Sequence, residues 1–245
     1  MAKIAQETWE VDGKSLPVFI YKERRRNNRI SITKRGVHIR IPSKLRLSQD
    51  ASWRSWAYKW LSTQLSKRPD IAERYNTRKY VDGHIVHTPV KNYELQLSES
   101  HRSTSKATLD GNMMRLHLNQ DLSDAYRAKT IRTLMSRLIA KDQLKRVSQR
   151  IHDINNHYFK LSINDIKIKN NSTNWGSCSS SGNINISIKT LLAPLEVQDY
   201  IYVHELSHRL EMNHSPAYWA IVEKVMPSYQ EYERWLKEHG HLCEL

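Results

Sequence analysis

The segment His204-Glu205-Leu206-Ser207-His208 reads HELSH, and His214 follows it six residues later. In a helix, residues four apart differ by about 40° in direction, so His204 and His208 can point their imidazoles at one metal ion. The apolar residues 200–203 that precede the motif indicate that one side of this helix is buried. The segment therefore predicts a helix, packed on one side, that presents two histidines to a metal.

His214 can reach the same metal only if the helix ends soon after His208. A straight helix would carry a residue ten positions beyond His204 about 15 Å along its axis and onto another face. Asn213 is a residue type that tolerates the left-handed conformation found just past helix ends, and Ser215-Pro216 is typical of an N-cap followed by the first residue of a new helix. We therefore expect a turn at residues 212–214 that returns His214 to the metal.

Three protein ligands that leave one position to water are typical of catalytic zinc, whereas structural sites are usually closed by four ligands, often cysteines. The chain has two cysteines, Cys178 and Cys243. Zinc lowers the pKa of a bound water from about 15.7 to about 7, and a carboxylate next to it can accept the proton as the oxygen attacks a carbonyl. The pattern predicts one Zn²⁺ per chain, held by His204, His208 and His214, with Glu205 as general base. Glu211 and Glu223 remain alternatives for the third ligand.

Four blocks of sequence carry a resemblance to a known family. They read NWGSCSSSGNINIS at 174–187, PLEVQDYIYVHELSH at 194–208, NHSPAYW at 213–219 and WL at 235–236. In this order they resemble the YgjP-like metallopeptidases, relatives of the SprT-like and WLM-type zinc peptidases, over about residues 20–240. The resemblance implies the same zinc ligands and the same general base as the spacing does. The family pattern typically has arginine where this chain has Asn174.

The composition indicates what kind of core the protein has and in which compartment it is expected. The chain has 245 residues, of which 39% are hydrophobic, enough for a core without disulfide staples. Two cysteines far apart, no apolar stretch near the N-terminus and no run of 18 apolar residues predict a reduced, cytoplasmic protein without a membrane partner. Cys178 is expected to be a packing residue rather than a nucleophile.

The chain is strongly basic, with 39 Lys and Arg against 25 Asp and Glu, a formal charge of +14. Such a surface attracts polyanions, so non-specific nucleic acid is a possible partner. An alternative is that these charges form the solvated face of a strand and its turn. The densest cluster is Lys22, Arg24, Arg25, Arg26 and Arg29.

The periodicity of apolar residues predicts an α+β protein with two lobes. Residues 1–120 form an N-terminal β-rich lobe, with a hairpin at 29–42 and one helix at about 50–66 capped by Ser48. In this helix Trp53, Trp56 and Trp60 are expected to share a buried face. Residues 121–245 form a zincin-like catalytic lobe that contains one long helix, or a broken pair of helices, at about 121–158.

Residues 183–187 alternate asparagine or serine with isoleucine, which predicts a strand. We interpret it as an edge strand beside the metal that binds an extended substrate through its backbone, with Asn183 and Asn185 as substrate-binding residues. An ordinary hairpin strand is the alternative interpretation.

Three functions follow from these observations. A zinc metallopeptidase that cleaves a peptide or protein substrate fits the ligand set best, because imidazole ligands favour zinc and acyl chemistry. A metal-dependent hydrolase of nucleotides or other phosphoanhydrides would use the same activated water and the basic surface. A nucleic-acid-associated protein with a non-catalytic zinc would leave Glu205 without a role.

Overall fold

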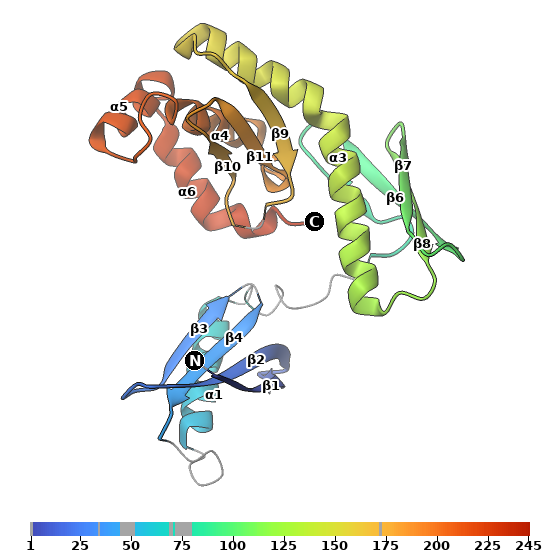
Figure 1. Ribbon diagram of the computed structural model, residues 1–245, viewed down its shortest axis with the longest axis vertical. Coiled ribbons are helices and arrows are strands. Elements are labelled where there is room, and N and C mark those ends of the chain that lie inside the picture. Colours follow the sequence, from blue (N-terminus) through green and yellow to red (C-terminus); the bar gives the residue numbers. More distant parts are fainter. Residues whose placement is uncertain (1, 34, 45–51, 69–70, 72–79, 172) are drawn as a thin grey trace. The chain divides into compact units, whose positions relative to one another are not determined.

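The computed structural model describes the chain except for residues 1, 34, 45–51, 69–70, 72–79 and 172. Contacts group the chain into two compact units, Met1–Arg78 and Lys79–Leu245. Both units contain strands and helices, which confirms the predicted α+β class (Figure 1). The predicted lobes, 1–120 and 121–245, assign residues 79–120 to the first part of the chain, whereas the contacts assign them to the second unit. The lobe boundary stays a prediction.

In its described residues, the first unit is a four-stranded sheet with a helix packed on it. Its elements are β1 (Ala2–Val11), β2 (Lys14–Glu23), β3 (Arg29–Thr33), β4 (Gly36–Pro42) and α1 (Ser52–Lys67). The strand order is β1-β2-β4-β3, and β2 pairs with β4 in parallel while the outer pairs are antiparallel. Alternate residues of β2 and β4 are buried with apolar residues of α1, so one face of the sheet forms the core of this unit.

The predicted hairpin at 29–42 is confirmed by the antiparallel pairing of β3 with β4. The predicted helix is confirmed as α1, although its expected cap, Ser48, lies outside the described residues. Trp53 is buried and Trp60 is partly buried, but Trp56 is 42% exposed. The prediction of one buried tryptophan face is therefore wrong for Trp56, because a helix on a single sheet face buries only a narrow stripe.

The second unit has two sheets on the long helix α3 (Asp124–Ile154), which confirms the helix predicted at 121–158. The first sheet has the order β5-β6-β8-β7, and the second has the order β10-β11-β9. Helix α3 contacts strands of both sheets (Figure 1). The strands are β5 (Ile85–His87), β6 (Asn92–Ser100), β7 (Lys106–Asp110), β8 (Met113–Asn119), β9 (Asp165–Lys169), β10 (Gly176–Cys178) and β11 (Asn183–Ser187).

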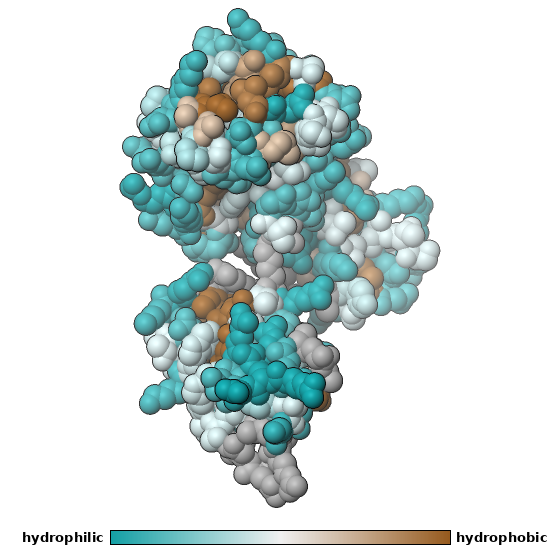
Figure 2. Space-filling model, turned by 60° about the vertical axis from the view of Figure 1, so that its left-hand side comes forward, coloured by the Kyte–Doolittle hydropathy of each residue, from teal (hydrophilic) through white to brown (hydrophobic). Residues whose placement is uncertain are grey.

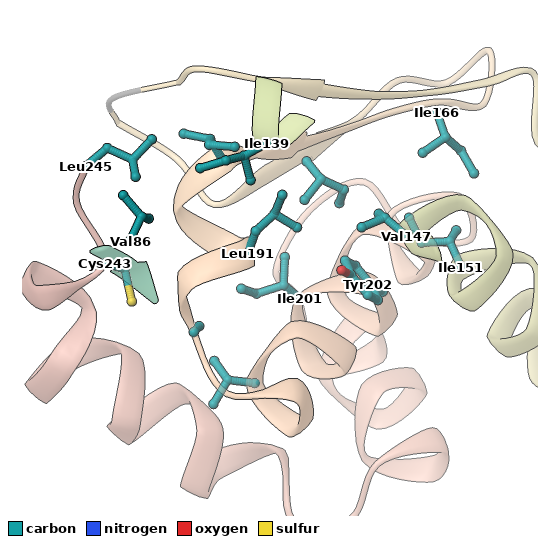
Figure 3. Packing of buried hydrophobic residues seen from close by; sticks show 14 of the residues in the cluster. Val86, Ile139, Val147, Ile151, Ile166, Leu191, Ile201, Tyr202, Cys243 and Leu245 are labelled. Atoms are coloured by element: carbon teal, nitrogen blue, oxygen red, sulfur yellow. The ribbon is translucent and has the colours of Figure 1, made fainter. Parts of the chain in front are cut away.

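Three further helices follow the second sheet: α4 (Leu195–Ser207), α5 (Pro216–Val225) and α6 (Tyr229–His239). One hydrophobic core joins all these elements, and it includes residues of β6 and β8 as well as of α3 and α4. Figure 3 shows Ile201 and Tyr202 of α4 pointing into this core near Leu191, Val147 and Ile151. Helix α4, which carries HELSH, is therefore held on its apolar side, as the sequence predicted.

The prediction that residues 183–187 form an edge strand is wrong. Strand β11 is the central strand of its sheet, with β10 antiparallel on one side and β9 parallel on the other. Its alternating pattern fits this position equally well, because the apolar residues of a strand report which face is buried and not which neighbours pair with it. Among the described residues, no helix combines the length and apolar character needed to cross a bilayer.

Candidate metal centre

Helix α4 ends in the way that the metal site requires. Its last turn tightens, since the amides of Arg209 and Leu210 donate to the carbonyls three residues before them. We expected Asn213 to adopt the left-handed backbone conformation, but its φ angle is not positive. The turn after α4 therefore forms without a left-handed residue at this position. Helix α5 then starts as predicted, with Pro216 in its first turn and the Ser215 hydroxyl accepting a hydrogen bond from the Tyr218 amide.

This turn brings His204, His208 and His214 together. One ring nitrogen from each lies within 4.8 Å of the others, and the Nε2 atoms of His204 and His214 are 3.2 Å apart. Neither Glu211 nor Glu223 belongs to this group among the described residues. The Glu211 carboxylate instead accepts a hydrogen bond from the Asn213 amide at 3.3 Å, which supports the turn.

The protonation states of the histidines suit a metal. Burial, together with the neighbouring imidazoles of His208 and His214, lowers the pKa of His204 to about 3, so its ring is neutral at pH 7. Burial also lowers the pKa of His208. The Nε2 atoms of His204 and His214 lie only 3.2 Å apart, an arrangement expected of two imidazole nitrogens that bind one cation. A divalent metal satisfies all three rings at once, so the residues fit a zinc ion.

Neighbouring groups orient the rings. The Nδ1 of His208 lies 3.2 Å from the Glu211 carbonyl oxygen, and a hydrogen bond there fixes the tautomer that leaves Nε2 free to bind a metal. Tyr218 stacks on His208 at 4.7 Å between centroids, and its hydroxyl donates to the His204 carbonyl at 3.0 Å. Trp219 stacks on His214 at 5.7 Å. Tyr218 and Trp219 therefore contact the histidines directly.

Glu205 points into a cavity of about 500 Å³ that the histidines also line. Its side chain is only 4% exposed, and burial raises its pKa to about 8. A carboxyl group with a pKa near neutrality can both accept and release a proton at physiological pH. The spacing of the motif predicted the position of Glu205 next to the histidines, and the geometry agrees with it.

Gly176 of β10 makes room for this carboxylate. A Cβ atom built at residue 176 would lie 2.5 Å from Oε1 of Glu205, closer than any real contact allows. The absence of a side chain at this position thus lets the strand pass directly beside Glu205. Sequence reasoning missed this role, although Gly176 lies in the NWGSC block that carried the family resemblance.

Cys178 also lines the cavity, and burial, with a smaller contribution from Glu205, raises the pKa of its thiol to about 11. The thiol is therefore protonated at neutral pH, which agrees with the packing role expected for it. Asn183 and Asn185 do not line the cavity. Their amides bind within the sheet and its turn, Asn183 with Asn164 and Asn185 with Ser177.

A family model described as YgjP-like, metallopeptidase domain, matches residues 26–239. The chain belongs to the YgjP-like metallopeptidase family. This confirms the resemblance seen in the sequence blocks, and membership in such a family implies a metal-dependent peptidase with a peptide or protein substrate.

The YgjP-like chain was also compared with curated proteins and with solved structures. No curated protein matches it. Among solved structures, the crystal structure of the metallopeptidase zymogen of Pyrococcus abyssi abylysin is similar to part of it, with 23% sequence identity and a TM-score of 0.35. That similarity covers 38% of this chain and 93% of the abylysin chain.

Proposed function

We propose that the chain is a zinc-dependent peptidase in which His204, His208 and His214 hold one zinc ion and Glu205 is the general base. The single observation that carries the proposal is the convergence of three imidazoles beside the buried carboxyl group of Glu205. We also propose that α4, with the sheet and helices around it, forms a zincin-like lobe. When bound, zinc would polarise the scissile carbonyl and acidify the attacking water.

Glu205 performs the proton transfers in this mechanism. As the water oxygen forms a bond to the carbonyl carbon, its proton moves to the Glu205 carboxylate. When the carbon–nitrogen bond breaks, Glu205 returns this proton to the leaving amine, so the carboxylate is regenerated. Gly176 contributes by leaving the space that Glu205 occupies, and the apolar wall of the cavity keeps bulk water from competing for the proton.

The free edge of β10 is the position at which an extended peptide would bind. Trp175 and Ser179 bond with β11 through their backbones, so the peptide groups of Gly176 and Cys178 between them point away from β11. The Gly176 carbonyl already accepts a hydrogen bond from the Asn174 side chain at 2.8 Å. We infer that the backbone of Cys178 offers the pairing groups for substrate, in place of the predicted Asn183 and Asn185.

The cavity favours a peptide over a phosphoanhydride. Among the described residues that line it there is no lysine or arginine, although the chain has 39 of them in total. A nucleoside triphosphate carries several negative charges that a phosphohydrolase site must neutralise. A neutral peptide backbone needs hydrogen bonds and apolar contacts instead. The cavity offers both, since Tyr200, Ile201, Met212 and Leu236 line it as well.

Metal content of the full-length protein tests the proposal. We expect about one zinc per chain in the wild type by elemental analysis, and a large loss in His214→Ala. His101→Ala is the matched control, because His101 is an exposed histidine outside the group, and it should keep its zinc. Equal zinc in His214→Ala and wild type would remove His214 from the ligand set.

Hydrolysis assays on the zinc-loaded protein then separate the two chemistries. We expect cleavage of a mixture of unfolded peptides, detected by mass spectrometry, and no release of phosphate from a nucleoside triphosphate. Phosphate release without peptide cleavage would overturn the peptidase proposal and favour the phosphoanhydride alternative.

A further inference from the structure

The sheet of the first unit has a second face that α1 does not cover. Side chains alternate along β2, so Val18 and Ile20 are buried towards α1 while Phe19 and Tyr21 lie on the opposite face. The register places His38 of β4 beside Phe19, and Arg40 beside Tyr21. We call this second surface the open face. All four of these side chains are partly exposed on it.

Three aromatic rings stack on the open face. His38 lies 5.1 Å from Phe19 and 5.5 Å from Tyr21 between centroids, with interplanar angles of 26° and 7°. The Nε2 atom of His38 is buried without a hydrogen-bond partner. Aromatic rings on the solvent side of a sheet do not contribute to the core of this unit, so their arrangement needs another explanation.

Cations accompany the rings. The Lys3 ammonium lies 4.9 Å from the centroid of Phe19, and the Arg40 guanidinium lies 5.7 Å from the centroid of Tyr21. Arg29 is the cross-strand neighbour of Arg40 in β3 and is exposed. The acidic neighbour is Glu23, which forms ion pairs with both Arg25 and Arg40 at 3.3 Å and so neutralises one of the two.

The charge of the whole chain is concentrated in this unit. Residues 1–78 contain 18 Lys and Arg against 7 Asp and Glu, a formal charge of +11, whereas residues 79–245 contain 21 against 18, a charge of +3. Figure 2 shows a mostly hydrophilic surface on this unit, with a hydrophobic patch among the polar residues. A polyanion would therefore be attracted to this unit far more than to the unit with the metal centre.

We propose that the open face binds single-stranded nucleic acid. Because the His38 ring is already stacked against Phe19 and Tyr21, bases stack on the remaining faces of these two rings. Lys3 and Arg40 leave those ring faces and, with Arg29, pair with the phosphates. This surface differs from the cluster at residues 22–29 that the sequence suggested, because its key residues are aromatic and come from neighbouring strands. A second function of this kind goes beyond the proposed peptidase activity.

The rings decide between single-stranded nucleic acid and other polyanions. A duplex offers its phosphates but keeps its bases stacked inside, and a sulfated polysaccharide has no bases at all. Cationic side chains without aromatic rings would be enough to bind a duplex or a sulfated polysaccharide. Stacked rings with cations beside them match a ligand in which unpaired bases alternate with phosphates.

Binding of fluorescein-labelled dT12 to the full-length protein tests the proposal. By fluorescence anisotropy at 50–200 mM NaCl we expect tighter binding to dT12 than to a duplex of equal length, and affinity that falls as salt rises. Phe19→Leu with Tyr21→Leu should weaken dT12 binding at least about fivefold and leave heparin binding unchanged. Unchanged dT12 affinity in this double variant would overturn the proposal.

A charge-matched pair of variants supplies the control. Lys3→Gln with Arg40→Gln removes two positive charges from the open face, and Lys59→Gln with Lys67→Gln removes two from exposed positions of α1. The first pair should weaken dT12 binding about tenfold, and the second should change it less than twofold. Equal losses in the two pairs would mean a diffuse polyelectrolyte effect and would contradict a site on the open face.

Photo-cross-linking of the wild-type protein avoids any effect of substitution on folding. A 5-bromodeoxyuridine oligonucleotide should cross-link to peptides that contain Phe19, Tyr21 or His38, identified by mass spectrometry. Glu205→Gln should give the same cross-links, because the metal centre has no part in this interaction. Cross-links confined to other segments would overturn the proposal.

Discussion

The two compact units of this chain differ in whether their polar side chains are buried or exposed. In Lys79–Leu245, Glu205 is 4% exposed and three histidines converge beside it, in a unit with a formal charge of only +3. In Met1–Arg78, charged and aromatic side chains lie on the solvent side of a sheet, and the formal charge is +11. Among the described residues, metal-binding residue types cluster only in the second unit.

This difference teaches that burial and exposure prepare side chains for different tasks. Burial raises the pKa of Glu205 and lowers that of His204, so it favours the neutral form of both groups. Exposed cations keep their charge and act at a distance, but salt screens them. The buried centre should therefore respond to substitutions and pH, and the open face mainly to salt and aromatic substitutions.

The largest effect is expected from Glu205→Gln. Loss of the general base should lower peptide hydrolysis by about 10²- to 10⁴-fold while zinc content and dT12 affinity stay unchanged. Glu211→Gln is the matched control, because it removes the same charge from a residue outside the metal group and keeps an oxygen for the Asn213 amide. An active Glu205→Gln enzyme would exclude Glu205 as the base.

Gly176→Ala should have a smaller effect on the same reaction. The new methyl group must displace the Glu205 carboxylate, and a misplacement of about 1 Å can cost roughly 10- to 100-fold in rate. Zinc content and the binding of dT12 should not change. In the Glu205→Gln background the same substitution should cause no further loss, since both changes act on one group. Additive losses would show that Gly176 acts independently of Glu205.

The smallest effect concerns stability in metal-free protein. The carboxyl of Glu205 loses its proton near pH 4.5 when unfolded but near pH 8 when folded, so between these values the unfolded state binds fewer protons. Its contribution to the free energy of unfolding should then fall by about 1 kcal/mol for each pH unit as pH rises. Urea unfolding at pH 5 and pH 7.5, with a chelator, measures it as the difference between wild type and Glu205→Gln. A pH-independent difference would mean that burial does not raise this pKa.

Both units expose apolar surface, and in the second unit this surface reaches the cavity. Figure 2 shows hydrophobic areas on both units, and the second unit has large apolar side chains that are more than half exposed, among them Leu210 (54%) and Met212 (53%). Met212 lines the cavity. Apolar surface beside the cavity agrees with a peptide substrate, whereas the open face of the first unit combines its rings with cations.

The sequence by itself determined the features that depend on local spacing. The four-residue step of HELSH predicted two histidines on one helix face, and Ser215-Pro216 predicted where the next helix begins. Alternation predicted the hairpin at 29–42, and the 3.6-residue period predicted α3. These signals are readable because one element decides them through its own geometry.

Only the tertiary structure decided which elements became neighbours. The alternation of residues 183–187 is the same for a central strand as for an edge strand, so the free edge of β10 could not be predicted. The packing of β6 and β8 into the core that holds α4 depends on long-range contacts. Gly176 lies 29 positions before Glu205, and the stacked rings of Phe19, Tyr21 and His38 come from two strands. Sequence periodicity describes a single helix or strand, and contacts between distant segments are set by how their faces pack together.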